Sequence, residues 1–141
     1  MTVSPIAKKL GMKTAMSALV IAAPSGYLKL LAPLPYGVVL SDVTSGAHGF
    51  VQLFATHASE IKKATPKLLK HAVPGALVWI AYPKKTSGLA SDLSRDSVCE
   101  VMKPTGWRPV AIVAIDDTWS ALRFRPMKDV KPRPGRQKKK T

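Results

Sequence analysis

Continuous hydrophobic runs, separated by polar turns, recur along this chain and predict its strands. Five of these runs show little alternation with polar residues: Ala18–Ala22, Val38–Leu40, Phe50–Phe54, Ala76–Ala81 and Val110–Ile115. Such runs are typical of strands that a sheet buries on both faces. A sixth run, Ser120–Phe124, alternates more and follows a short polar turn, so we expect it to be an antiparallel edge strand.

Helical patterns lie between some of these runs. Pro5 and Gly11 bound a short N-terminal helix within Ser4–Met12, because proline suits the first position of a helix and glycine its end. Gly26 opens a second helix that continues to Leu31 and stops before two prolines. Both helices are therefore expected to be brief.

The longest helical pattern, Thr56–Lys70, is amphipathic, with lysines on its polar face. Its apolar face holds Ile61, Thr65, Leu68 and Ala72. Pro66 interrupts the pattern and predicts a kink or a restart of the helix. A further helix is expected to begin after an N-cap at Ser94 and to end at Pro104.

Strands that alternate with helices predict a parallel sheet with right-handed crossovers. The expected fold class is α/β: a three-layer, Rossmann-like, mostly parallel sheet with an antiparallel edge strand, in the strand order 3-2-1-4-5. No helix fits the polar segment between the second and third strands, Ser41–Gly49. One domain accounts for residues 1–125, and the composition of residues 126–141 predicts a disordered basic tail.

The formal net charge of +14 does not come from this tail alone. Lys128–Thr141 contains seven Lys or Arg residues and one Asp, a net +6, which leaves +8 for the rest of the chain. A basic body favours polyanions or anionic surfaces as partners. Solubility explains the same charge, and both interpretations remain open.

Cysteine content and hydrophobic run length indicate the compartment. Cys99 is the single cysteine, which excludes an intramolecular disulfide and suits a reducing, cytoplasmic location. No run approaches the roughly 20 apolar residues that cross a bilayer. Three lysines before Ala15–Ala23 match the outline of a secretory signal, which we rank second because its removal would delete the first strand.

The loop after the first strand is the expected place for a nucleotide or methyl-donor cofactor. Ligands in such sheets lie beyond the carboxyl ends of the strands, held by a Gly-rich first loop and by an acidic residue after the second strand. This loop has a single glycine, Gly26, and Asp42 is the candidate for the ribose hydroxyls. Free N–H groups at Ser25 and Gly26 would bind an anion, but Pro24 and Tyr27 crowd the loop. A degenerate scaffold loop is favoured over cofactor binding.

Lys84 and Lys85, followed by Thr86 and Ser87, form the most suggestive polar cluster. Two cations beside hydroxyl and backbone donors suit a phosphate or a carboxylate. The alternative, which we prefer slightly, is that one of these lysines pairs with Asp92 or Asp96 and orders the long loop.

Other candidate groups have simpler structural roles. Asp116 and Asp117 lie on a turn, where capping is a commoner role for carboxylates than acid–base chemistry. Trp119 closes the cleft or packs in the core, and the core is favoured. The three histidines lack the spacing of metal ligands, so no metal site and no catalytic triad are predicted.

Clustered lysines and arginines suggest nucleic acid as an alternative partner, bound through its phosphates. The candidate residues lie on the polar face of the Thr56–Lys70 helix and in the tail: Lys63, Lys67, Lys70, Lys131, Arg133, Arg136, Lys138, Lys139 and Lys140. Few aromatic residues accompany them, so recognition of single strands by stacking is not indicated. A solvated basic surface remains the structural alternative.

Five segments of the chain together resemble a family of bacterial domains catalogued as Domain of Unknown Function 3052. They are AKKLGMK at Ala7–Lys13, APSGYLKLLAPLP at Ala23–Pro35, YPKKTSG at Tyr82–Gly88, SDLSRD at Ser91–Asp96 and DDTWSALRF at Asp116–Phe124. The resemblance covers nearly everything up to about Phe124 and leaves out the tail. It implies a small methyltransferase-like Rossmann domain, implies no reaction, and weakens the secretory-signal interpretation.

These observations favour a non-catalytic cytoplasmic binding or interaction protein. Its degenerate methyltransferase-like cleft would accept an anionic small molecule or a partner group. Two alternatives stay open: an enzyme that binds S-adenosylmethionine or a nucleotide, and a nucleic-acid-associated protein. The candidate ligand residues are Ser25, Gly26, Tyr27, Asp42, Lys84, Lys85, Ser87, Asp116 and Trp119.

Overall fold

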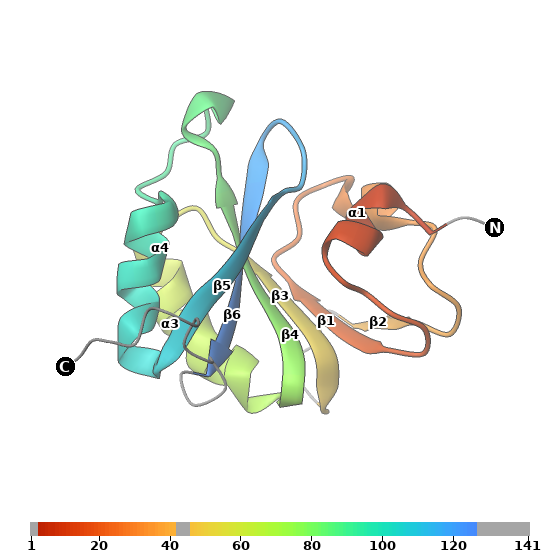
Figure 1. Ribbon diagram of the computed structural model, residues 1–141. Coiled ribbons are helices and arrows are strands. Elements are labelled where there is room, and N and C mark those ends of the chain that lie inside the picture. Colours follow the sequence, from red (N-terminus) through yellow and green to blue (C-terminus); the bar gives the residue numbers. More distant parts are fainter. Residues whose placement is uncertain (1–2, 42–45, 127–141) are drawn as a thin grey trace, which may run out of the picture.

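The computed structural model describes residues 3–41 and 46–126 and shows a six-stranded sheet with helices on both faces (Figure 1). The strands are β1 (Ser17–Ile21), β2 (Val39–Ser41), β3 (His48–Phe54), β4 (Ala72–Pro83), β5 (Trp107–Ala114) and β6 (Trp119–Pro126). The helices are α1 (Pro5–Lys9), α2 (Tyr27–Leu31), α3 (Ala58–Lys70) and α4 (Arg95–Met102), with 3-10 turns η1 (Lys85–Ser87) and η2 (Lys103–Thr105). Within the described ranges, no helix is long and apolar enough to span a bilayer.

The sheet confirms the predicted α/β class and corrects the predicted strand order. Strands β2, β1, β3 and β4 are parallel neighbours, and antiparallel pairing is confined to one edge. The order is β2-β1-β3-β4-β6-β5, so the third strand lies beside the first and fourth strands and not beyond the second. The physical reason is burial: β3 is buried along nearly its whole length and occupies the centre, whereas the three-residue β2 is partly exposed and suits an edge.

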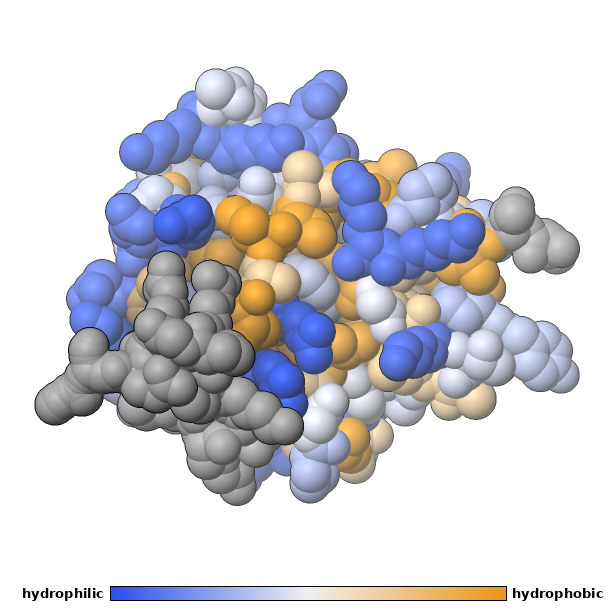
Figure 2. Space-filling view, in the orientation of Figure 1, coloured by the Kyte–Doolittle hydropathy of each residue, from blue (hydrophilic) through white to orange (hydrophobic). Residues whose placement is uncertain are grey.

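The last strand is antiparallel, as predicted, but β5 lies outside it. β6 pairs with β4 on one side and with β5 on the other. Ala121, Leu122 and Phe124 of β6 are buried, while most of β5 is exposed. The edge of the sheet is therefore antiparallel, as predicted, but its outermost strand is the more apolar β5 and not β6. The prediction that Val110–Ile115 is buried on both faces is wrong, because β6 takes the position between β4 and β5. In the view of Figure 2, hydrophobic side chains reach the surface of the molecule. The exposed apolar residues of β5 include Val110 and Ile112.

The two faces of the sheet carry separate hydrophobic cores. Phe50 and Phe54 of β3 pack in the core that α1 and α2 cover, whereas Val51 and Leu53 pack in the core beneath α3 and α4. Successive side chains of a strand point to opposite faces, so an unbroken apolar run supplies both cores at once. This arrangement makes the three layers that the sequence predicts.

Helix α3 is one continuous helix and contains Pro66 without a restart. Glu60 accepts hydrogen bonds from the backbone N–H groups of Thr56 (2.7 Å) and His57 (3.0 Å). These two bonds satisfy donors at the start of the helix and lower the pKa of the Glu60 carboxyl. The helix ends before Ala72, which belongs to β4 and not to the predicted apolar face.

One buried polar pair lies within the core on the α1 and α2 side. The Tyr27 hydroxyl donates a hydrogen bond of 2.6 Å to Oε1 of Gln52, a fully buried residue of β3. The Gln52 Nε2 group has no partner in the described part of the chain. Burial raises the pKa of Tyr27, and the charge of Asp116 raises it further.

This pair predicts how stability changes at alkaline pH. An unfolded tyrosine ionises near pH 10, whereas the folded protein keeps Tyr27 neutral, so the free energy of unfolding falls as the pH rises above about 10. Tyr27→Phe is expected to flatten this fall and to cost about 1–3 kcal/mol at neutral pH, because Gln52 Oε1 loses its donor. Urea unfolding between neutral pH and pH 11 measures both effects.

Tyr36→Phe is the matched control for that experiment, because the Tyr36 side chain is 87% exposed. It is expected to change neither the neutral-pH stability nor its alkaline decline. Burial also raises the pKa of Tyr82, so part of the decline persists in the Tyr27→Phe variant. A Tyr27→Phe protein with the unaltered alkaline profile would contradict the role given to the buried phenol.

Candidate functional site

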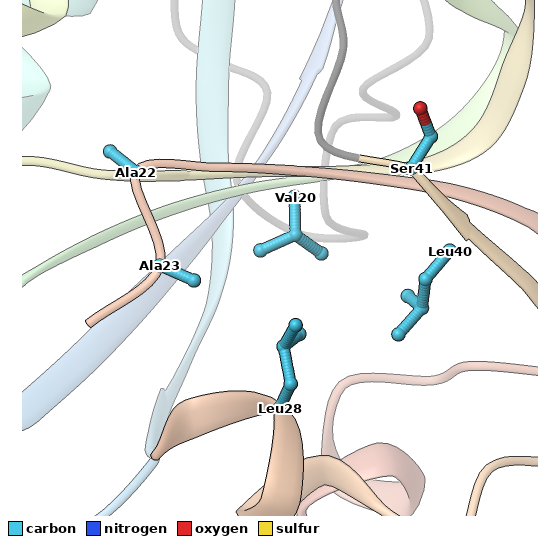
Figure 3. A pocket seen from close by; sticks show the side chains of 6 residues that line it. All are labelled: Val20, Ala22, Ala23, Leu28, Leu40 and Ser41. Carbon is cyan, nitrogen blue, oxygen red and sulfur yellow. The ribbon is translucent and has the colours of Figure 1, made fainter. Parts of the chain in front are cut away.

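A cavity of about 520 Å³ opens where β1 and β2 end and α2 begins. Its lining residues are Val20, Ala22, Ala23, Leu28, Leu40 and Ser41. Figure 3 shows Val20 and Leu40 pointing towards Leu28 of α2, with Ala23 between the strand end and the helix. The cavity is therefore walled mainly by aliphatic side chains and lies at the carboxyl ends of two parallel strands.

The turn out of β1 shapes one wall of this cavity. Ala22 has a φ of +61°, in the left-handed region where glycine is normally found. Gly26, with a φ of +85°, then precedes α2, and the Tyr27 N–H donates to the Pro24 carbonyl at 3.1 Å. The loop therefore has two residues with a positive φ, as glycine-rich loops do, but one of them is an alanine with a strained backbone.

The predicted residues of the first loop lie beside the cavity and do not line it. Ser25 and Gly26 are exposed to solvent, and a side chain added at Gly26 would meet open space. The Tyr27 N–H already has a partner, and α2 is only five residues long, so the expected anion site at the start of this helix is not supported. Asp42, the candidate for ribose hydroxyls, lies outside the described residues.

Tyr27 and Trp119 belong to a row of buried aromatic rings. The rings of Tyr27 and Phe54 are 4.6 Å apart, and those of Phe54 and Trp119 are 5.1 Å apart, both edge to face. Tyr27 is 3% exposed and Trp119 is 8% exposed. Trp119 therefore packs in the core, which is the role the sequence favours for it, and Tyr27 joins it there.

The predicted lysine cluster lies two strands away from the cavity, after β4. Lys85 is exposed, Lys84 is half-buried, and the Ser87 hydroxyl accepts a bond from the Leu89 N–H at 3.2 Å. Neither lysine forms an ion pair with Asp92 or Asp96 in the described part of the chain. Asp92 instead accepts a 2.8 Å hydrogen bond from the Ala58 N–H, the first of α3. Asp92 therefore fixes the long loop to a helix and not to a lysine.

Asp116 stabilises a turn. Its Oδ1 atom accepts hydrogen bonds from the Thr118 and Trp119 N–H groups, both at 2.8 Å. This confirms the structural role that the sequence favours over acid–base chemistry for Asp116. The structure thus keeps Asp116 close enough to influence Tyr27 but does not place it on the cavity wall.

Sequence reasoning missed most residues of the cavity wall: Val20, Ala22, Leu28, Leu40 and Ser41. The available sequence signal was the run Tyr27–Leu31, in which a helix of five residues has three leucines and a tyrosine, more than one face can bury. In the structure Leu28 and Leu30 are exposed, at 50% and 41%. Exposed leucines beside a strand end indicate an unfilled apolar surface, whereas strand pattern alone does not tell a cavity wall from a core.

Metal and nucleophile chemistry has little support in the described residues. They contain no group of three or more His, Cys, Asp or Glu side chains that could hold a metal ion. Burial raises the pKa of Cys99, which opposes formation of a reactive thiolate. His48 is buried against the Ser17 hydroxyl, 2.8 Å from its Nδ1 atom, on β3.

The basic candidates divide between α3 and the tail. Lys63, Lys67 and Lys70 are all exposed along α3, as the amphipathic pattern predicts. The predicted domain boundary at residue 125 falls at the end of β6. The tail candidates, Lys131 to Lys140, lie outside the described residues.

Comparison with solved structures identifies the fold. The chain superimposes on an S-adenosylmethionine-dependent methyltransferase from Aquifex aeolicus with a TM-score of 0.60 and 17% identity, over 84% of this chain and 86% of the other. A DhpI complex with S-adenosylhomocysteine gives 0.59 and 13% identity, over 86% and 83%. The N-methyltransferase NodS from Bradyrhizobium japonicum gives 0.54 and 12% identity, over 80% and 87%. The fold is therefore methyltransferase-like, as the resemblance implies.

Comparison with family models gives no match, and comparison with curated protein sequences gives none. Membership of the Domain of Unknown Function 3052 family therefore stays a prediction. The three structures named are 12–17% identical to this chain, and likenesses at this level show the fold alone.

The strained turn at Ala22 makes a stability prediction. Ala22→Gly is expected to raise the free energy of unfolding by roughly 1 kcal/mol, because glycine adopts a positive φ without the clash of a Cβ atom. The midpoint of thermal unfolding should rise by about 2–4 °C. Ala23→Gly is the control, because Ala23 has no positive φ, and it should not stabilise the protein. Equal effects of the two substitutions would show that the turn at Ala22 stores no strain.

Proposed function

We propose that this protein binds an adenosyl ligand of the S-adenosylmethionine class in the cavity between β1, β2 and α2, and that it acts as a binding or interaction protein. The supporting observation is the cavity's position at the carboxyl ends of two parallel strands in a methyltransferase-like fold. Membership of the bacterial family and a cytoplasmic location belong to the same proposal and rest on sequence alone.

The cavity suits the adenosine part of such a ligand better than a small anion. Its volume of about 520 Å³ falls within the usual range for small-molecule sites. Val20, Leu28 and Leu40 offer aliphatic surface to the faces of a purine ring, and no cationic side chain lines the described cavity. Asp42 directly follows β2 in the sequence and is the candidate for the ribose hydroxyls.

The described residues favour binding over methyl transfer. The lining residues carry no titratable side chain. Two titratable groups predicted at the loops have other roles: the Tyr27 hydroxyl donates a hydrogen bond to Gln52 inside the core, and Asp116 accepts two backbone hydrogen bonds in a turn. The described lining residues therefore offer no side chain that would take a proton from a methyl acceptor.

Isothermal titration with S-adenosylmethionine and S-adenosylhomocysteine tests the proposal. Saturable one-to-one binding is expected for the unaltered chain. Ala23→Phe, which places a ring in the cavity, should weaken it at least about tenfold, since a filled site excludes the ligand. Ala90→Phe, at an exposed loop position, adds the same group elsewhere and should bind like the unaltered protein.

Two results would contradict this proposal. Absence of saturable binding, or equal affinity of the Ala23→Phe and unaltered proteins, would rule out the adenosyl ligand in this cavity. Transfer of a radiolabelled methyl group from S-adenosylmethionine to a cellular fraction, lost in Ala23→Phe, would overturn the non-catalytic part and support the enzyme alternative.

Exposure of Lys63, Lys67 and Lys70 along α3 supports a second candidate function, binding of nucleic acid phosphates. Changing all three to Gln is expected to weaken duplex DNA binding and to lower the slope of log affinity against log salt by about 2–3. Changing Lys8, Lys13 and Lys29 to Gln removes the same charge from other exposed positions and is the control. Equal losses in both variants, or a salt-independent affinity, would contradict a role for α3.

A further inference from the structure

Strand β6 carries two arginines on one face, near its end. Ala121 of β6 packs in the core that α1 and α2 cover, whereas Leu122 and Phe124 pack in the opposite core. Side chains of a strand alternate between its two faces, so Arg123 and Arg125 continue the face of Ala121. Both arginines are half-buried, and each therefore keeps a part that solvent reaches. The face that is apolar at Ala121 is thus basic towards the end of β6.

A third arginine lies opposite this pair on β5. Arg108 is the partner of Arg125 in the antiparallel register, and the side chains of two such partners lie on the same face of a sheet. Like charges in these positions destabilise a pair of strands. Arg108 is exposed and takes part in a further interaction, so it adds charge to this face, while Arg123 and Arg125 define the site.

The carboxylates that the structure describes do not pair with the arginines of β6. Neither Arg123 nor Arg125 forms an ion pair with a described residue. Asp116 and Asp117 lie at the opposite end of the β5–β6 hairpin, and the carboxylates of α3 and α4 belong to helices on the other face. The charge on this face is therefore positive.

The guanidinium group of Arg123 is partly withdrawn from water. Its Nε atom is covered and has no hydrogen-bond partner among residues 3–41 and 46–126, so a ligand would approach the terminal Nη groups. Burial lowers the pKa of Arg123, and the charge of Arg125 lowers it further. Both effects disfavour the charged form of the side chain. A neighbouring anion opposes both, because it stabilises that charge.

We propose that Arg123 and Arg125 form a site for a diphosphate group. Residues two apart on a strand are separated by about 7 Å, so each guanidinium can meet one of two linked phosphates. Each guanidinium donates parallel hydrogen bonds from its two Nη atoms, the planar geometry in which arginine recognises phosphate. Arg108 adds a third positive charge beside Arg125.

This site is separate from the adenosyl cavity. The cavity lies at the carboxyl ends of β1 and β2, next to the β2 edge of the sheet. The arginines lie near the β5 edge, where the end of β6 meets the first half of β4. Either proposal therefore stands without the other.

Isothermal titration of the full chain with sodium diphosphate, at low ionic strength and without divalent cations, tests the site. Saturable one-to-one binding is expected, with a rise in the midpoint of thermal unfolding. Arg125→Gln should weaken binding at least about tenfold, because the charge-assisted hydrogen bonds to one phosphate are lost. Arg95→Gln removes the same charge from an exposed position on α4 and should bind like the unaltered chain.

Two further measurements separate a built site from effects on the fold or on net charge. Without diphosphate, Arg125→Gln should unfold at no lower temperature than the unaltered chain, because it relieves the repulsion with Arg123. Arg125→Lys keeps the charge and loses the planar donor geometry. Its affinity for diphosphate should lie between those of the unaltered chain and Arg125→Gln.

Inorganic diphosphate and ADP distinguish two sources of the diphosphate group. Both are titrated into Ala23→Phe, in which the ring occupies the adenosyl cavity, so adenosine binding there does not contribute. Equal affinities would identify the free diphosphate as sufficient. Tighter binding of ADP would identify a nucleotide, and either result supports the site.

Three results would overturn the site. They are absence of saturable one-to-one binding, equal affinities of Arg125→Gln and Arg95→Gln, and an Arg125→Lys protein that binds like the unaltered chain. The last result would show that net charge alone attracts the anion. Loss of duplex DNA binding in Arg125→Gln, without any binding of diphosphate, would also overturn it and would assign this face to a nucleic acid backbone.

Discussion

Burial of β3 and β4 on both faces is the constraint on which the rest of this structure depends. Each strand is an apolar run whose alternate residues enter two different cores, so helices must cover both sides of the sheet. The same requirement places β3 next to β1 and leaves the short β2 at the edge. A cavity then forms where this short strand and the five-residue α2 leave the end of β1 uncovered.

The aromatic row anchors the loop that borders this cavity. Tyr27 points inward to Gln52 and Phe54, which fixes the first residue of α2 against the sheet. Leu28, the next residue, is then free to face the end of β2. Ala22 carries the backbone strain of this tight turn, because it adopts a left-handed conformation that normally favours glycine.

The position of the proposed adenosyl site follows from the topology of the sheet. The cavity at β1 and β2 offers aliphatic surface beside a strand end, the position at which Rossmann-like sheets hold ligands. A second cavity lies on the opposite face of the sheet, between α3 and the end of α4. The sheet topology accounts for the position of the first cavity and not for that of the second.

Local features of this protein follow from the sequence alone. The strand runs, the Ser94 cap of α4 and the turn at Asp116 each depend on neighbouring residues, through side-chain alternation, helix capping and short-range hydrogen bonds. Tertiary structure alone decided the strand order, the burial of Tyr27, and the meeting of Leu28 with Leu40 across the cavity. These depend on which surfaces remain uncovered after distant segments pack, and such non-local contacts leave no period or spacing in the sequence.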